Sequence, residues 1–299
     1  MLNIIKYYKF WFAISTLLFV IGIGSLLAYG LEFGIDFKGG TLSQLTFSQG
    51  LPTNAQIQEE LRANGVGDAI IQPLEGKSVI IRTGPQEKEQ HDKMLEALRN
   101  KFGDINEEQF SSIGPTIGQE LRTKAIYQFI LITLGIILYI AYAFRKVSKP
   151  VSAWKFGWSA IIALIHDLFI VLGAFALLGH FKGVEIDSLF VTALLTVLGF
   201  SVHDTIVVFD RIRENLRVRA GQNLDEIINS SINQTLVRSI NTTLTVLFVL
   251  TALLLFGGET IRYFVLALII GITAGTYSSI FIASPLLMIW HSVGLRRKI

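Results

Sequence analysis

The segment FWFAISTLLFVIGIGSLLAY, residues 10–29, contains 20 residues and no charged side chain. A helix of about 20 apolar residues, rising about 1.5 Å per residue, is long enough to cross the roughly 30 Å hydrocarbon layer of a bilayer. Comparable apolar stretches run near Ala125 to Phe144, Phe156 to Leu178, Ile186 to Phe209, Leu236 to Phe256 and Tyr263 to Trp290. We therefore expect an α-helical membrane protein with six transmembrane helices.

Composition agrees with this expectation and excludes several classes of protein. The 299 residues are 51% hydrophobic and only 16% charged, with a mean hydropathy of +0.53, which is too apolar for an ordinary soluble domain. The chain has no cysteine, so disulfides, thiol nucleophiles and cysteine-based zinc sites are excluded. We also find no nucleotide loop, metal cluster or activated nucleophile, and we expect no enzymatic activity, no cofactor and no metal.

The charges are distributed asymmetrically along the chain. Residues 31–124 carry 14 acidic and 10 basic side chains, which leaves 9 acidic and 16 basic ones elsewhere. If the six spans alternate in direction, 13 basic residues fall on one side: Lys6, Lys9, Arg145, Lys146, Lys149, Lys155, Arg211, Arg213, Arg217, Arg219, Arg296, Arg297 and Lys298. The two short opposite loops offer Lys182 and Arg262. Positive charge favours the cytoplasmic side, so both termini are expected there, with the first span as an uncleaved anchor. This split argues against a nucleic-acid partner.

The chain is expected to divide into three parts. Residues 1–30 form a cytoplasmic N-terminus and the first span, residues 31–122 an extracytoplasmic domain, and residues 123–299 the other five spans with cytoplasmic loops and C-terminus. The middle part shows the alternation of strands and the periodicity of amphipathic helices. Its expected elements are a strand at Thr41–Phe47, a helix at Thr53–Asn64 with a Thr53/Gln56 capping box, strands at Ala69–Leu74 and Ser78–Arg82 joined by a turn at Glu75–Lys77, a helix at Glu87–Phe102, and a strand near Gln109–Ile113. This β-α-β-β-α-β order predicts a ferredoxin-like α+β domain, with His91 as a solvated residue on a helix surface.

Three ionisable residues are expected inside the membrane. An isolated charge at mid-membrane costs about 2.5–3.5 kcal/mol, so each needs a partner, a wet cavity or a neutral form. Asp204 lies in the inner half of the fourth span, and Arg238 near the inner start of the fifth span can reach the same depth. Asp167 lies near the centre of the third span, beside His166. The pair formed by Asp204 and Arg238 is either an inert ion pair or a proton relay, and Asp167 either joins that relay or simply bonds to Ser or Thr on a neighbouring helix.

Two other features of the spans are weaker signals. His203 directly precedes Asp204, so its side chain points about 100° away around the helix, and it is interpreted as a packing or interface residue. Gly271 and Gly275 form a G-x-x-x-G pattern in the sixth span, which predicts close helix packing within this bundle.

Four stretches together resemble a known family. Gly34-Ile-Asp-Phe-Lys-Gly-Gly-Thr41, directly after the first span, resembles the signature that enters the periplasmic domain in the SecD/SecF family of translocase subunits. Three further stretches, Ser112–Leu121, Ser201–Asn215 and Gly275–Pro285, are similar to the SecF side of that family. In the motif, Asp36 is the acidic residue, while Gly34, Gly39 and Gly40 are expected to supply unusual backbone angles where the span becomes sheet.

The resemblance implies a function. It suggests an accessory subunit in the bacterial inner membrane that acts with SecD and the SecYEG channel on a translocating preprotein and uses the proton-motive force. It also places the family's transport carboxylate and arginine at Asp204 and Arg238. The same resistance-nodulation-division superfamily leaves open half of a proton-coupled small-molecule antiporter. A passive scaffold for SecD or SecYEG is the third alternative.

Overall fold

The computed structural model describes residues 2–67, 69–74, 76–145, 151–219 and 221–296. Two compact units are present, one formed by Met1–Glu32 with Tyr127–Ile299 and the other by Phe33–Ile126. Helix α5 (Pro115–Ala143) continues from the second unit into the first.

The first unit is a bundle of long apolar helices. It contains α1 (Tyr8–Tyr29), which follows a short 3-10 helix η1 (Ile5–Tyr7), and most of α5, then α6 (Ala153–Lys182), α7 (Ser188–Val218), α8 (Leu224–Phe256), α9 (Glu259–Ser278), the π-helix η2 (Ser279–Ala283) and α10 (Ser284–Arg296). In the described residues, six helices are long and apolar enough to cross a membrane, the last formed by α9, η2 and most of α10. The six predicted spans are therefore present.

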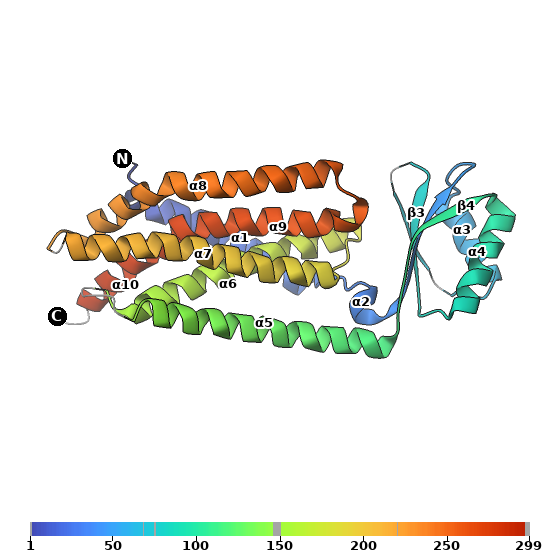
Figure 1. Cartoon of the computed structure of the whole chain (residues 1–299), viewed down its shortest axis with the longest axis horizontal. Helices are drawn as coiled ribbons and strands as arrows, with labels where there is room; N and C mark the ends of the chain where they lie inside the picture. The colour runs from blue at the N-terminus through green and yellow to red at the C-terminus, as the bar shows by residue number, and fades with distance from the viewer. Residues whose placement is uncertain (1, 68, 75, 146–150, 220, 297–299) are drawn as a thin grey trace. The chain divides into compact units, whose positions relative to one another are not determined.

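Close contacts between small residues hold the bundle together. Helices α7, α8 and α9 pack against one another, and α1 packs along α6 (Figure 1). A Cβ atom added to Gly22 of α1 would lie 2.7 Å from the backbone oxygen of Phe169 in α6, so the two backbones approach too closely for a side chain. The sixth span changes to π-helix just before Pro285, whose ring cannot donate a backbone hydrogen bond.

The second unit is a small α+β domain. After the one-turn helix α2 (Ile35–Lys38) come β1 (Gly40–Phe47), α3 (Asn54–Ala63), β2 (Ile70–Pro73), β3 (Ser78–Thr83), α4 (Lys88–Phe102) and β4 (Ile105–Ile113). The sheet has the order β2-β3-β1-β4, and each neighbouring pair is antiparallel. Its core includes Leu45, Phe47, Ile57, Leu61, Val79, Ile81, Met94 and Leu98. The predicted β-α-β-β-α-β order is present.

Local signals explain most of the boundaries in this domain. Thr53 and Gln56 form the predicted capping box at the start of α3, and Gly103 ends α4 with φ at +85°. The turn predicted at Glu75 lies partly outside the described residues. Strand β4 begins four residues earlier than predicted, because its polar first half pairs with β1.

The prediction for His91 was wrong. Its side chain is buried, with a relative exposure of 4% for the residue, and not solvated. It shares the apolar stripe of α4 with Met94, three residues along, stacks on Phe110, and places Nε2 2.9 Å from a carboxylate oxygen of Glu107 in β4.

Candidate functional site

The carboxyl group of Asp204 lies inside the helical bundle. Its residue is 7% exposed and sits in the middle of α7. Ser239 of α8 donates a hydrogen bond of 2.6 Å from its Oγ to Oδ1 of Asp204. The other carboxylate oxygen, Oδ2, is buried and has no hydrogen-bond partner among the described residues. An ionised carboxylate with one buried oxygen lacking a hydrogen bond carries an uncompensated desolvation cost, and binding a proton removes its charge.

Arg238 and His203 line the same small cavity as Asp204. The cavity, about 10 Å³ in volume, is also bounded by Ser239 and Thr242, and it has roughly the size of one water molecule. Arg238 and His203 are otherwise exposed at the bundle surface. No ion pair within 4 Å joins Asp204 to Arg238 in the part of the chain that the structure describes. The structure thus brings the two predicted residues to one cavity without pairing them directly.

Neighbouring contacts fix the position of α8 against α7. Asn215 of α7 donates to Ser231 Oγ at 2.7 Å and to Gln234 Oε1 at 2.9 Å on α8. Thr243 of α8 shares a 2.7 Å hydrogen bond with Thr276 of α9. Polar contacts on both sides of Asp204 therefore tie α8 to the rest of the bundle.

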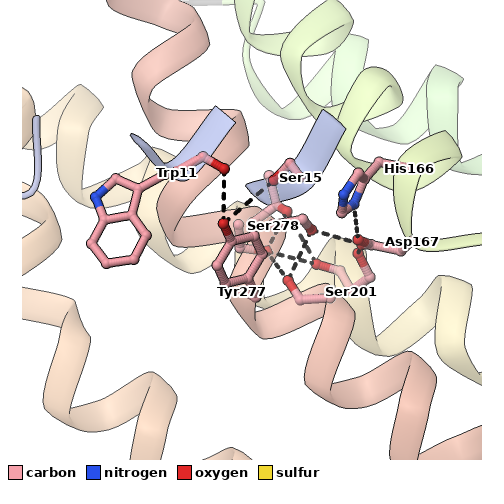
Figure 2. Close-up of polar contacts among 10 residues, drawn as sticks. Trp11, Ser15, His166, Asp167, Ser201, Tyr277 and Ser278 are labelled. Atoms are coloured by element: carbon pink, nitrogen blue, oxygen red, sulfur yellow. Dashed lines mark hydrogen bonds and ion pairs between the residues drawn. The ribbon is translucent and has the colours of Figure 1, made fainter. Parts of the chain in front are cut away.

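Asp167 is the second buried carboxyl group. It is fully buried in α6, and its Oδ2 accepts hydrogen bonds from Ser201 of α7 at 2.6 Å and from Ser278 of α9 at 2.7 Å. Its Oδ1 lies 3.0 Å from Nδ1 of His166. Figure 2 shows these side chains converging from three helices. The serine contacts foreseen as one alternative are present.

The hydroxyl network continues beyond Asp167. Thr205 of α7 shares a 2.7 Å hydrogen bond with Ser279, and Ser279 donates to the backbone oxygen of Gly275. The hydroxyl of Tyr277 donates to the backbone oxygen of Trp11 in α1 (Figure 2). The sequence analysis did not single out Ser201, Ser239 and Ser278 as hydrogen-bond donors to the buried carboxyl groups. The signal that could have identified them is a hydroxyl residue in a neighbouring span at the depth of the carboxyl group.

The two glycines of the sixth span, Gly271 and Gly275 of α9, pack against α7. A Cβ atom on Gly271 would collide with the side chain of Val197, and one on Gly275 would lie 2.8 Å from Cβ of Ser201. Gly275 therefore allows the close approach that places Ser201 and Ser278 against the same carboxyl group.

The glycines of the 34–41 motif lie in the second unit. Gly39 has φ at +76° and Gly40 at +146°, which L side chains rarely adopt. A Cβ atom on Gly40 would also lie 2.8 Å from the backbone oxygen of Thr83. The expectation was wrong for Gly34, whose φ of −76° and ψ of −178° suit any residue. Asp36 lies in the first turn of α2.

Among the described residues, no group of three or more His, Asp or Glu side chains is placed to hold a metal ion. The features that stand out chemically are the two buried carboxyl groups, each contacted by hydroxyls from neighbouring helices.

Comparison with known proteins identifies the family. Residues 93–293 match the family described as protein export membrane protein SecD/SecF, C-terminal, and residues 24–50 match the SecD/SecF GG motif. The chain is 46% identical to the protein translocase subunit SecF of Thermobaculum terrenum, over 98% of this chain and 95% of the relative. It is 41% identical to the protein of the same name from Anaerolinea thermophila, with the same coverage.

A solved structure agrees in both sequence and fold. The crystal structure of SecDF, a translocon-associated membrane protein from Thermus thermophilus, matches with a TM-score of 0.84 and 34% identity over 97% of this chain. This chain spans only 39% of the length of that protein. These matches cover nearly all of the sequence, and the chain belongs to the SecD/SecF family of protein export membrane proteins, on its SecF side.

Proposed function

We propose that the chain is a non-enzymatic subunit of the Sec protein translocase, which acts with SecD to couple the proton-motive force to export of a preprotein through SecYEG. Relatives that align over almost their whole length carry the name of such a subunit. The SecDF match supports the partner, because this chain corresponds to 39% of a protein whose name joins both subunits. SecD would correspond to the rest of that protein.

The proposed setting is the bacterial inner membrane, with both termini in the cytoplasm. Helix α5 supports contact with lipid or with a partner, since Tyr127 and Leu131 are 68% and 70% exposed despite being apolar. The basic residues at one end of the spans support the orientation. Of these, Lys146, Lys149, Arg297 and Lys298 lie outside the described residues.

The proposed outer domain, residues 31–122, has a ferredoxin-like fold. The strand order β2-β3-β1-β4 and the two intervening helices support this assignment. In the proposed cycle, this domain handles the emerging polypeptide while the spans bind and release protons.

The proton relay is proposed to centre on Asp204, with Arg238 as its charge partner and Asp167 as a second carboxyl. The observation that carries this is the buried, unpartnered Oδ2 of Asp204 beside a water-sized cavity that Arg238 also lines. Ionised Asp204 attracts the guanidinium across the cavity, and a protonated carboxyl does not. Proton binding therefore changes the force between α7 and α8, which is the requirement for coupling a proton to a two-state motion.

The experiment is preprotein export into inverted membrane vesicles, measured with and without a protonophore. The variant Asp204→Asn keeps the shape of the side chain and is expected to assemble with SecD while losing the protonophore-sensitive part of export. Asp210→Asn is the matched control, because Asp210 is an exposed carboxylate on the same helix, paired with Arg213. Unchanged export in Asp204→Asn would refute the coupling and leave a scaffold.

A further inference from the structure

His166 is a buried histidine with one ring nitrogen engaged and one free of partners. The residue is 6% exposed, in the middle of α6. Its Nδ1 lies 3.0 Å from Oδ1 of Asp167, whereas its Nε2 has no hydrogen-bond partner among the described residues. Buried polar atoms nearly always have a partner, so this nitrogen needs an explanation.

The side chain of His166 lines a cavity that opens at the surface of the bundle, where Thr16 and Ile165 are exposed. The cavity is about 220 Å³ in volume, well above the roughly 10–15 Å³ that one water molecule requires. Its walls come from α1, α6, η2 and α10, and include Ser15, Thr16, Ile162, His166, Ile282 and Leu286. Within the described lining, His166 is the only ionisable side chain, and the hydroxyls of Ser15 and Thr16 are the other polar groups.

The contacts of Asp167 indicate its charge state. Two serine hydroxyls donate to Oδ2, so a negative carboxylate is well matched there. A neutral imidazole then donates its Nδ1 proton to Oδ1, which leaves a lone pair on Nε2 as a proton acceptor. In this state the pair carries a net charge of about −1 inside the bundle, which is costly to hold there.

We propose that His166 and Asp167 together form a second proton-binding site, reached through the cavity between α1, α6 and α10 and separate from the cavity at Asp204. Nε2 forms a bond to a proton delivered by a hydronium ion, which leaves as water. The product is either an imidazolium beside a carboxylate or, after transfer of the Nδ1 proton, a neutral imidazole beside a carboxylic acid. Both forms have no net charge, so one proton removes the buried charge.

Among the described side chains around His166 and Asp167, no other group is available to bind the proton. Helix α7 presents Ser201, and α9 presents Ser278 and Tyr277, of which only Tyr277 titrates. The hydroxyl of Tyr277 is already engaged with the backbone of Trp11 and with Ser15. The carboxyl group of Asp204, also on α7, lines the other cavity.

Proton binding at this pair would change its hydrogen bonds to α7, which carries Asp204, and to α9. Ser201 lies one turn before Asp204 on α7, and Ser278 directly precedes the π-helix η2. In the form with a carboxylic acid, the loss of charge on Asp167 weakens the two serine hydrogen bonds, since a hydrogen bond to an ionised acceptor is stronger than one to a neutral acceptor. The use of this proton in export rests on the proposed function, whereas its binding does not.

The test is nitrogen NMR of the full chain, labelled with ¹⁵N-histidine and reconstituted in lipid vesicles. His166→Gln assigns the signal, and His180→Gln is the matched control, because His180 lies on the same helix and stacks on Tyr29. Over the range of buffers from mildly basic to acidic, the His166 signal is expected to change from that of a neutral ring protonated at Nδ1 to that of a ring with a proton on Nε2. A signal that stays unchanged over this range would overturn the proposal.

Two further variants test the partner and the route. Asp167→Asn removes the carboxylate and is expected to alter the titration of His166, and an identical titration would show that the two do not act as a pair. Thr16→Phe fills the cavity and is expected to slow proton exchange at Nε2 without changing the end states, whereas an unchanged exchange rate would refute this route. Because none of these readouts uses export, a failure here is distinguishable from a failure of the coupling at Asp204.

Discussion

Replacing Asp204 with Asn is expected to make the helical bundle more stable, by about 1–2 kcal/mol, under conditions in which the native carboxyl is ionised. Ser239 can still donate to the amide oxygen, but a charge-assisted hydrogen bond becomes a neutral one, which costs about 1–1.5 kcal/mol. The same change removes a charge from inside the spans, which stabilises the folded bundle by about 2.5–3.5 kcal/mol. The gain should shrink as the pH falls, because the native carboxyl is then itself neutral.

An inert ion pair predicts the opposite sign. If Asp204 served only to balance Arg238, removing one partner would cost about 3–5 kcal/mol. The assay is reversible unfolding in mixed micelles at two pH values, with Asp210→Asn as control. Asp210 forms an exposed pair with Arg213, and its loss should change the free energy of unfolding by less than about 1 kcal/mol. Strong destabilisation by Asp204→Asn alone would refute the reasoning.

Three more predictions concern the surroundings of the site and the second unit. Ser239→Ala leaves Asp204 with no hydrogen bond from the described residues and is expected to change the pH dependence of export while leaving assembly with SecD intact; an unchanged pH profile would contradict this. Gly275→Val collides with α7 and is expected to lower the unfolding free energy by about 1–3 kcal/mol, the range for overpacking, as measured by unfolding in micelles. Gly40→Ala, whose added Cβ atom meets backbone and whose φ is unfavourable, should destabilise the second unit more than Gly50→Ala, whose φ is also positive but which faces open space; equal losses in thermal unfolding would contradict this.

The spans could be predicted from the sequence because each is a continuous apolar run, whereas the partners of the buried acids could not. Arg238 and Ser239 are neighbours on α8, so their side chains point about 100° apart around the helix. Ser239 makes the hydrogen bond to Asp204, and Arg238 lies at the cavity and the surface. Only the rotation of α8 about its axis decides between them, and hydrophobicity does not mark that rotation here, because the buried side of this stretch carries hydroxyl residues: Ser231, Thr235, Ser239 and Thr243.

In the second unit, too, some features could be predicted from the sequence and others could not. Its element order and the capping box at Thr53 were readable from local patterns. The burial of His91 was also readable, because His91 lies at helical spacing from Met94, Leu95 and Leu98 on the buried face of α4. Its contacts with Phe110 and Glu107 were not readable, because they depend on how β4 packs against the helix. The glycine motif was readable as a need for unusual backbone angles at Gly39 and Gly40.

The central claim is that the carboxyl of Asp204 binds a proton inside the bundle. The most direct measurement is the infrared difference spectrum of the reconstituted chain on acidification, in which a protonated carboxyl gives its own carbonyl band. We expect a band from a buried acid that is missing in Asp204→Asn and retained in Asp210→Asn and Asp167→Asn. If the spectra of the native chain and Asp204→Asn are the same in this region, Asp204 does not take up a proton and the account is contradicted.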